Sequence, residues 1–317
     1  MSFETITFGR ITNSYLNQAI IGSTMKNQKK YVDLNLEYSS QKKVTTLSDD
    51  PMSITALFGA KNDLSKIASY SKNIDLNTSE LNVAESSLDS VNKDLTRIYA
   101  LASQASSELN GQEEATVIAN EVEEILKHII NLSNTNYNGK HIFAGASMNN
   151  AAYDVVGNDY RYQGTTDADG YKINVQISDN TSITLNENGN NIFGEYYVST
   201  TTVSYGVVGH VKELLNDLRA TPPNFDNIRA KLDVFKKDQE NVTYYRTKVG
   251  TNLSILEKVK DQLAEQKINS ETLRANLEDS NLVEVASKLQ YQEYALQASL
   301  QSASKVVQNS LLNFLGS

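Results

Sequence analysis

The sequence feature that most constrains the fold is a long run in which apolar residues recur at alternating steps of three and four. The run comprises Leu81, Ala84, Leu88, Val91, Leu95, Ile98, Ala102, Ala105 and Leu109. Four heptads of this alternation are typical of a helix that packs along another helix. A second run alternates in the same way and comprises Ala115, Ile118, Val122, Ile125, Ile129 and Leu132. Because a short turn at Asn110-Gly111 separates the runs, we expect an antiparallel helical hairpin whose second helix ends at Asn138-Gly139.

The long helix that carries the first run is expected to begin at Ser48-Asp49-Asp50-Pro51. Asp50 can accept hydrogen bonds from free backbone N–H groups, and its negative charge suits the positive end of the helix dipole. Pro51 suits the first helical position, where its missing N–H costs no hydrogen bond. Asp49 and Asp50 could instead belong to a catalytic or metal site. Since no histidine or further acid accompanies them, we interpret them as a helix start.

The last helix, predicted from Asn281 to Leu315, combines a seam of apolar residues with few charges. Asn281 and Glu284 form a capping-box pattern at its start. Its apolar positions are Leu282, Val285, Leu289, Leu296, Leu300, Val307, Leu311 and Phe314. This pattern predicts burial against more than one neighbouring helix, although it also fits an ordinary core helix of a monomeric bundle.

The N-terminal segment carries a weaker helical pattern, with Ile11, Leu16 and Ile20 among its apolar positions. A helix with so few apolar residues buries too little surface to offset the entropy lost on ordering. We therefore expect this segment to pair with the last helix.

Residues 141–205 change character from helical to strand-like patterns. Three runs alternate or are rich in β-branched residues, and turn residues separate them. The runs are Tyr160 to Tyr162, Lys172 to Ile177 and Ser182 to Leu185. Asp167 and Asp169-Gly170 resemble the start of a calcium-binding loop, but the glutamate expected at its twelfth position is missing, so we interpret them as a hairpin turn.

These patterns predict a mainly α protein. We expect an elongated coiled-coil or helical-bundle rod with paired N- and C-terminal helices and a small inserted β domain. The expected domains are a terminal coiled-coil assembly domain (residues 1–45 and 281–317), a helical rod (46–140 and 206–280) and the inserted β domain (141–205).

The composition excludes several classes of partner. The formal net charge is −9 and the pI is about 5.0, and Lys and Arg form no concentrated face, so nucleic acid is not an expected partner. The chain has no cysteine, which rules out disulfides and thiolate metal sites. No apolar run is long enough to span a membrane, and the N-terminus lacks the features of a cleavable signal peptide.

The sequence also carries no pattern of catalytic or cofactor-binding residues. It has no phosphate-cradling Gly-Lys loop, no His-Glu-x-x-His and no Gly-x-Ser-x-Gly. The histidines His128, His141 and His210 are far apart in the sequence, and we interpret each as an isolated surface residue. We therefore expect no enzyme activity, no cofactor and no metal.

Ordered motifs at both ends of the chain resemble those of the flagellin superfamily. At the N-terminal end they are Arg10 to Ser14, Ser48 to Pro51, and Asn136 through Gly139 and Lys140 to Gly145. At the C-terminal end they are Arg246 to Gly250 with Asn252-Leu253, Asp279 to Glu284, Ala295 to Ala298, and Ser310 to Leu315. Within the superfamily the chain is most similar to the hook-associated protein 3 family of hook–filament junction proteins. The segments Tyr162 to Thr165 and Asn191 to Gly194 favour that family over the flagellins.

This resemblance implies a structural subunit of the bacterial flagellum that lies between hook-associated protein 1 and the flagellin filament. It implies a ring of identical subunits, export without a cleavable signal peptide by the flagellar type III apparatus, an export chaperone on the C-terminal helix, and an extracellular location. The alternatives are flagellin itself and, more remotely, a secreted coiled-coil adhesin or effector.

Two sets of residues follow from the resemblance and from the helical patterns. The expected assembly interface comprises Ile11, Leu16, Ile20, Leu289, Leu296, Leu300, Val307, Leu311 and Phe314. The expected family-motif and structural residues are Arg10, Asn13, Asp49, Asp50, Pro51, Asn136, Gly139, Gly145 and Gly250.

Overall fold

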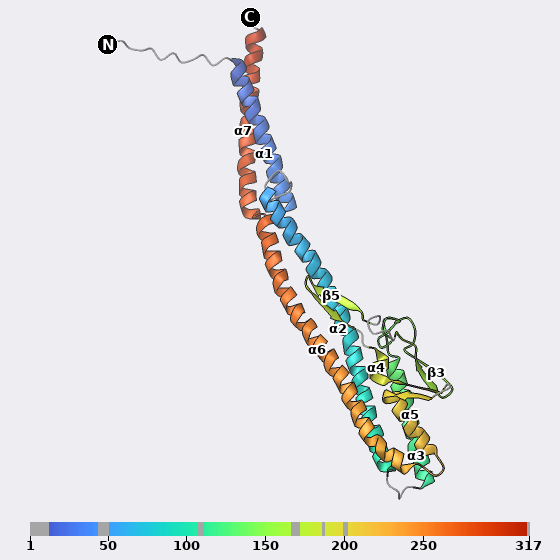
Figure 1. Cartoon of the computed structure of the whole chain (residues 1–317). Helices are drawn as coiled ribbons and strands as arrows, with labels where there is room; N and C mark the ends of the chain where they lie inside the picture. The colour runs from blue at the N-terminus through green and yellow to red at the C-terminus, as the bar shows by residue number, and fades with distance from the viewer. Residues whose placement is uncertain are drawn as a thin grey trace. The chain divides into compact units, whose positions relative to one another are not determined.

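The computed structural model describes residues 13–43, 51–106, 111–165, 172–185, 188–198 and 202–315 (Figure 1). Its helices are α1 (Asn13–Ser40), α2 (Pro51–Ala105), α3 (Gln112–Ser133), α4 (Gly189–Phe193), α5 (Gly206–Arg219), α6 (Phe225–Glu278) and α7 (Leu282–Leu315). The mainly α class, the pairing of the terminal helices and the inserted β region are confirmed. The chain divides into two compact units, residues 1–65 with 267–317 and residues 66–266. The finer division into three domains stays a prediction.

Helices α2 and α6 share a buried seam in the unit formed by residues 66–266. The buried α2 residues repeat every seven positions and are Ile67, Ile74, Leu81, Leu88, Leu95 and Ala102. The buried α6 residues repeat in the same way and are Ile228, Phe235, Val242, Val249, Leu256 and Leu263. A repeat of seven keeps one stripe of each helix against its partner, as in a coiled coil. The first heptad run predicted from the sequence is thus confirmed as a packing face, except at Leu109, which lies outside the described residues.

The second predicted helix, α3, is also confirmed, but its end is not where the Asn-Gly dipeptide indicated. Helix α3 ends at Ser133, and Asn138-Gly139 forms the turn of a hairpin between β1 (Asn136–Tyr137) and β2 (Lys140–His141). Both turn residues have positive φ, 51° at Asn138 and 81° at Gly139. An Asn-Gly pair suits such a two-residue hairpin turn as well as a helix end, which is why the prediction was wrong.

The inserted β region contains a four-stranded antiparallel sheet and a separate hairpin. The sheet has the order β3 (Tyr153–Val156), β4 (Asp159–Tyr162), β7 (Glu195–Val198) and β8 (Thr202–Tyr205). The hairpin pairs β5 (Asn174–Ser178) with β6 (Thr181–Thr184). All three predicted strand runs therefore form strands, whereas the Asp167 to Gly170 turn lies outside the described residues.

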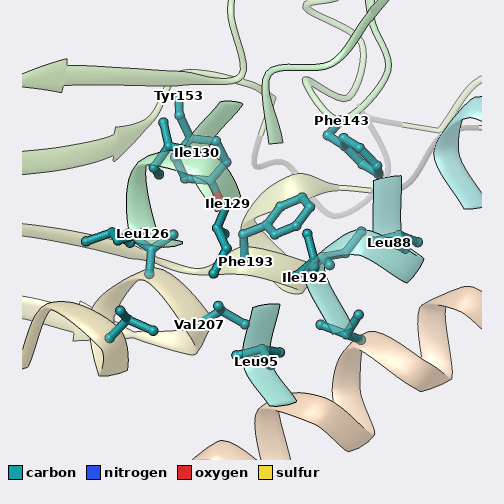
Figure 2. Packing of buried hydrophobic residues seen from close by; sticks show 14 of the residues in the cluster. Leu88, Leu95, Leu126, Ile129, Ile130, Phe143, Tyr153, Ile192, Phe193 and Val207 are labelled. Atoms are coloured by element: carbon teal, nitrogen blue, oxygen red, sulfur yellow. The ribbon is translucent and has the colours of Figure 1, made fainter. Parts of the chain in front are cut away.

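A single hydrophobic core joins the β region to the helices of the same unit (Figure 2). Phe193 lies at its centre with edge-to-face contacts to Phe143 and Tyr153, at ring-centroid distances of 5.2 and 6.2 Å. Residues of α2, α3 and α5 surround these rings, among them Leu88, Leu95, Leu126, Ile129, Ile130 and Val207. The Tyr153 hydroxyl donates to the carbonyl oxygens of Gly194 (2.7 Å) and Gly189 (3.1 Å), and burial raises its pKa. This shared core therefore holds the inserted β region against the helices.

Each of the three histidines has a hydrogen-bonding partner of its own, and His128 is exposed whereas His141 and His210 are half-buried. Nδ1 of His128 lies 2.7 Å from Oδ2 of Asp94, and Nδ1 of His210 lies 2.8 Å from Oδ2 of the buried Asp238. Nδ1 of His141 lies 2.9 Å from the Asn134 carbonyl oxygen. Each partner lies outside the element of its histidine, at a spacing that forms no motif, so the sequence does not reveal it.

Within the described ranges, no helix is both long enough and apolar enough to cross a membrane. The same residues contain no group of three or more His, Cys, Asp or Glu side chains placed to hold a metal ion.

Candidate assembly interface

Helices α1 and α7 lie side by side in the unit formed by residues 1–65 and 267–317 (Figure 1). Each has a half-buried or buried stripe at steps of three and four. The α1 stripe comprises Ile20, Thr24, Asn27, Tyr31, Leu34 and Glu37. The α7 stripe comprises Val285, Leu289, Gln292, Leu296, Ser299 and Ala303. Nε2 of Gln292 donates to the Asn27 carbonyl (3.1 Å), and Oγ1 of Thr24 donates to the Ser299 carbonyl (3.4 Å).

This seam is poor in buried apolar side chains. Among the described side chains of α1 and α7, Val285 is the only hydrophobic one that is fully buried. Polar or small residues occupy many of the other positions that face across the seam. The pair is therefore held by less apolar burial than the seam between α2 and α6, and burial is the main stabilising contribution to a helix pair.

The structure places part of the predicted assembly interface on this seam. Ile20, Leu289 and Leu296 belong to the half-buried stripes, whereas Leu300 is exposed. The remaining predicted residues cannot be placed on a face. The side chains of Leu16, Val307, Leu311 and Phe314, which belong to α1 and α7, lie outside the described part, as does the whole of Ile11. Their role in assembly stays a prediction.

A second apolar stripe, which the sequence analysis missed, is exposed on the same two helices. On α1 it comprises Tyr15, Met25, Val32 and Leu36, and on α7 it comprises Val283, Tyr291 and Tyr294. Tyr291 is 76% exposed and Tyr294 is 71% exposed. On α1 these residues follow steps of three and four when Gln18, Gly22 and Lys29 are included. That spacing was a usable signal, but the sequence did not show which of two interleaved stripes faces α7.

The break between α6 and α7 is followed by a capped start of α7. Oδ1 of Asn281 accepts hydrogen bonds from the backbone N–H groups of Val283 (3.2 Å) and Glu284 (3.4 Å), which confirms Asn281 as the cap of α7. The Glu284 carboxylate pairs with Lys288 at 2.6 Å, one turn further along the helix. Its predicted role in a capping box stays a prediction.

Charged side chains surround the end of α6. Oε1 of Glu278 lies 2.6 Å from Nζ of Lys42 and 2.9 Å from Nζ of Lys61, and the Glu278 side chain is only 4% exposed. We call these three residues the Glu278 triad. The hydrogen bond from Lys42 is the largest of the effects that hold the pKa of Glu278 below its ordinary value, whereas burial acts in the opposite direction.

The lowered pKa predicts an acid-sensitive contribution to stability. A carboxyl with a pKa below its unfolded value of about 4.3 stabilises the fold above that pH and loses this effect as pH falls through the folded pKa. We therefore expect Glu278→Gln to lower the thermal midpoint near neutral pH, and the difference from the unaltered chain to vanish in acid. Circular dichroism melting of both proteins across this range measures it.

The matched control is Glu284→Gln, which removes the exposed ion pair with Lys288 and should change the midpoint little. A difference between Glu278→Gln and the unaltered chain that stays constant across the pH range would contradict the prediction.

The family-motif residues have several structural roles. Pro51 begins α2, as predicted. Oδ1 of Asn136 accepts a hydrogen bond from the Gly139 N–H (2.9 Å) and so closes the β1–β2 turn. Gly145 has a φ of 64°, which favours glycine, whereas Gly250 lies within α6 with open space around it. Asn13 is the first residue of α1, and its side chain is not described. Arg10, Asp49 and Asp50 lie outside the described residues.

Two further motif segments serve the packing of the other unit. Nη2 of Arg246 on α6 lies 2.6 Å from Oε1 of Glu85 and 3.0 Å from Oδ1 of Asp89, both on α2. The Tyr162 hydroxyl donates to the Phe143 carbonyl (2.9 Å), which joins two motif segments in the core. These residues therefore stabilise the fold.

Known proteins share both the N-terminal sequence and the fold. Residues 11–148 match the model of the bacterial flagellin N-terminal helical region. FlgL from Bacillus cereus has 22% identity and a TM-score of 0.55, and the match covers 70% of this chain and 100% of that one. The flagellar junction protein FlgL from Legionella pneumophila has 12% identity and a TM-score of 0.58, with 71% and 100% covered.

A Vibrio parahaemolyticus protein, provisionally described as flagellar hook-associated, has 21% identity and a TM-score of 0.63, with 73% and 100% covered. No curated protein matches the chain in sequence. The similarity in sequence thus concerns the N-terminal helical region, whereas the similarity in fold extends to most of the chain. More particularly, the chain carries a bacterial flagellin N-terminal helical region and has the fold of the FlgL structures.

Proposed function

We propose that this protein is a non-catalytic subunit of the hook–filament junction of the bacterial flagellum. The observation that carries the proposal is the α1–α7 pair, which has a weak internal seam and a separate exposed apolar stripe. Exposed apolar stripes of this kind mark surfaces that pack against other proteins. The likeness in fold to hook-associated and junction proteins over their whole length supports the same assignment.

In this proposal, identical subunits form a ring by packing their terminal helices side by side. The stripe of Met25, Val32 and Leu36 on α1, with Tyr291 and Tyr294 on α7, would lie between neighbouring subunits. Fully burying a Val, Leu or Met side chain contributes about 1.5–3 kcal/mol, so this contact between subunits would add to the stability that the seam within one chain provides. Leu300, Val307, Leu311 and Phe314 would extend the same contacts toward the C-terminus.

The proposed partners are hook-associated protein 1 on one side of the ring and flagellin on the other. The proposed location is extracellular, reached through flagellar type III export without a cleavable signal peptide. A chaperone that covers the C-terminal helix before export would shield the exposed stripe, because an uncovered apolar surface promotes aggregation.

The test is assembly of the purified chain on isolated hooks capped with hook-associated protein 1, followed by electron microscopy. We expect a layer of limited length that then accepts flagellin. Deletion of residues 300–317 should abolish binding while the unit of residues 66–266 stays folded, as measured by hydrogen exchange.

Matched substitutions test whether binding depends on the tyrosines of the exposed stripe or on exposed tyrosines in general. Tyr291→Ser with Tyr294→Ser should weaken binding, whereas Tyr244→Ser, at a tyrosine of α6 that is 62% exposed, should not. Indefinite growth of the chain into filaments would instead support flagellin, and binding that survives the deletion would contradict the proposed interface.

A further inference from the structure

The Glu278 triad belongs to a larger set of contacts that ties the end of α1 to the break between α6 and α7. The Lys43 N–H donates to the Glu278 carbonyl (2.9 Å), and the Ser280 N–H donates to the Gln41 carbonyl (2.9 Å). The Ser280 hydroxyl donates to Oε1 of Glu37 (2.6 Å). The Lys43 ammonium also donates to the Asn276 carbonyl. Contacts from α1, from the residues that directly follow it and from α2 therefore converge on Glu278 at the end of α6 and on Ser280, one of the three residues that separate α6 from α7.

The seam itself carries little information about register. A heptad seam of similar residues allows one helix to slide along its partner by seven positions at small cost unless a distinctive contact opposes it. In the described α1–α7 seam, small and polar side chains recur along both helices, and Val285 alone is fully buried among the apolar ones. The hydrogen bonds that the buried Gln292 donates to Asn27 favour the native alignment from within the seam, and a distinctive contact at the end of the seam can add to them.

We infer that the Glu278 triad sets the register of the α1–α7 pair, so that its main effect is on which alignment forms and not on how stable the pair is. Lys42 lies two residues past the end of α1, Lys61 lies on α2, and Glu278 ends α6, so Lys42 joins the other two at Oε1 only in one alignment of α1. After a slide of one heptad, the buried Glu278 carboxylate would keep Lys61 but lose Lys42, and removing a partner from a buried charge is costly.

The buried charges of the Glu278 triad are better suited to selecting one alignment of the helices than to raising the stability of the helix pair. Removing two or three charges from water costs about as much as their attraction returns, so such groups contribute little net stability. Leaving one charge unpaired is strongly unfavourable, so the same groups discriminate sharply between alignments. The inference concerns the isolated chain and does not depend on the proposed place in the flagellum.

The test uses the absence of cysteine from the chain, so introduced thiols are the only ones present. A native reporter carries Asn27→Cys with Gln292→Cys, because these side chains are in hydrogen-bond contact. A shifted reporter carries Asn27→Cys with Ser299→Cys, one heptad further along α7. Disulfides form only between Cα atoms within about 7 Å, so each reporter detects one alignment. Yields are measured after mild oxidation.

Each cysteine pair is introduced into two proteins, one with the Glu278 triad unaltered and one that also carries Lys42→Met, Lys61→Met and Glu278→Met. In this methionine background, apolar side chains of similar length replace the three charges. We expect the ratio of shifted to native disulfide to rise at least about tenfold in the methionine background, while the thermal midpoint changes little. The control background, Glu284→Gln with Lys288→Gln, removes an exposed ion pair of α7 and should leave the ratio unchanged.

An unchanged ratio in the methionine background would overturn the inference. If that background prevents pairing, so that neither disulfide forms, Glu278→Gln decides the matter: a raised ratio supports the inference and an unchanged ratio overturns it. A lowered thermal midpoint with an unchanged ratio would assign the triad to stability alone, which also overturns it.

Discussion

Replacing Phe193 with alanine should lower the free energy of unfolding by about 3–5 kcal/mol, the usual cost of removing a buried aromatic ring. The Phe193 side chain is fully buried and touches the rings of Phe143 and Tyr153. Alanine would leave a cavity lined by residues of several elements, and a core held by helices on several sides can collapse only partly into it. Because this core joins the β region to α2, α3 and α5, we also expect faster hydrogen exchange throughout the β region.

The measurement is chemical denaturation followed by tyrosine fluorescence and circular dichroism. Phe58→Ala is the matched control, since Phe58 is 65% exposed on α2 and its loss should change the free energy of unfolding by less than about 0.5 kcal/mol. Equal effects of the two substitutions would show that Phe193 does not lie at the centre of the core.

Gly194→Ala should be comparably severe for a different reason. Gly194 has a φ of 68° and a ψ of −161°, a region that side chains with a Cβ rarely enter. A Cβ at this position would lie 1.9 Å from the Tyr205 carbonyl oxygen. The backbones of Gly194 and Gly206 approach each other here, so the contact cannot be relieved by rotating a side chain. We expect a loss of about 3 kcal/mol or more in the free energy of unfolding.

Gly250→Ala provides the opposite case within the same unit. Gly250 lies inside α6, and an added Cβ would meet no atom within 4 Å. Alanine should therefore stabilise the chain by about 0.5–1 kcal/mol, because glycine loses more backbone entropy in a helix. Both variants are measured by the same denaturation experiment, and changes of the same sign would contradict the argument.

The helical part of the fold could be predicted because its signal is local. Leu88 and Leu95 are buried as their spacing indicated, since a residue on one stripe of a helix shares the environment of its neighbours at three and four positions. The heptads of α6 were less visible in the sequence. Only polar residues lie between Phe235 and Val242, and the common burial of Ile228, Phe235 and Val242 shows that they form one seam.

The candidate interface was predicted less completely. The terminal pairing of α1 with α7 followed from the weak N-terminal pattern, but the exposed stripe that includes Met25 and Tyr291 did not. Both α1 stripes have helical spacing, so the choice between them depends on which side α7 covers. That choice is made by contacts between residues more than 200 positions apart in the chain, such as those of Asn27 with Gln292.

The apolar periodicity of the chain is thus sufficient to specify long helices, an inserted β region and terminal segments that need partners, because burial and backbone hydrogen bonding act over a few residues. The alignment of those helices along one another could not be predicted from this periodicity. Lys42, Lys61 and Glu278 form no motif, and Asn138-Gly139 suits a helix end and a hairpin alike. In each case two local solutions have similar free energy, and the contacts made after distant segments meet select one of them.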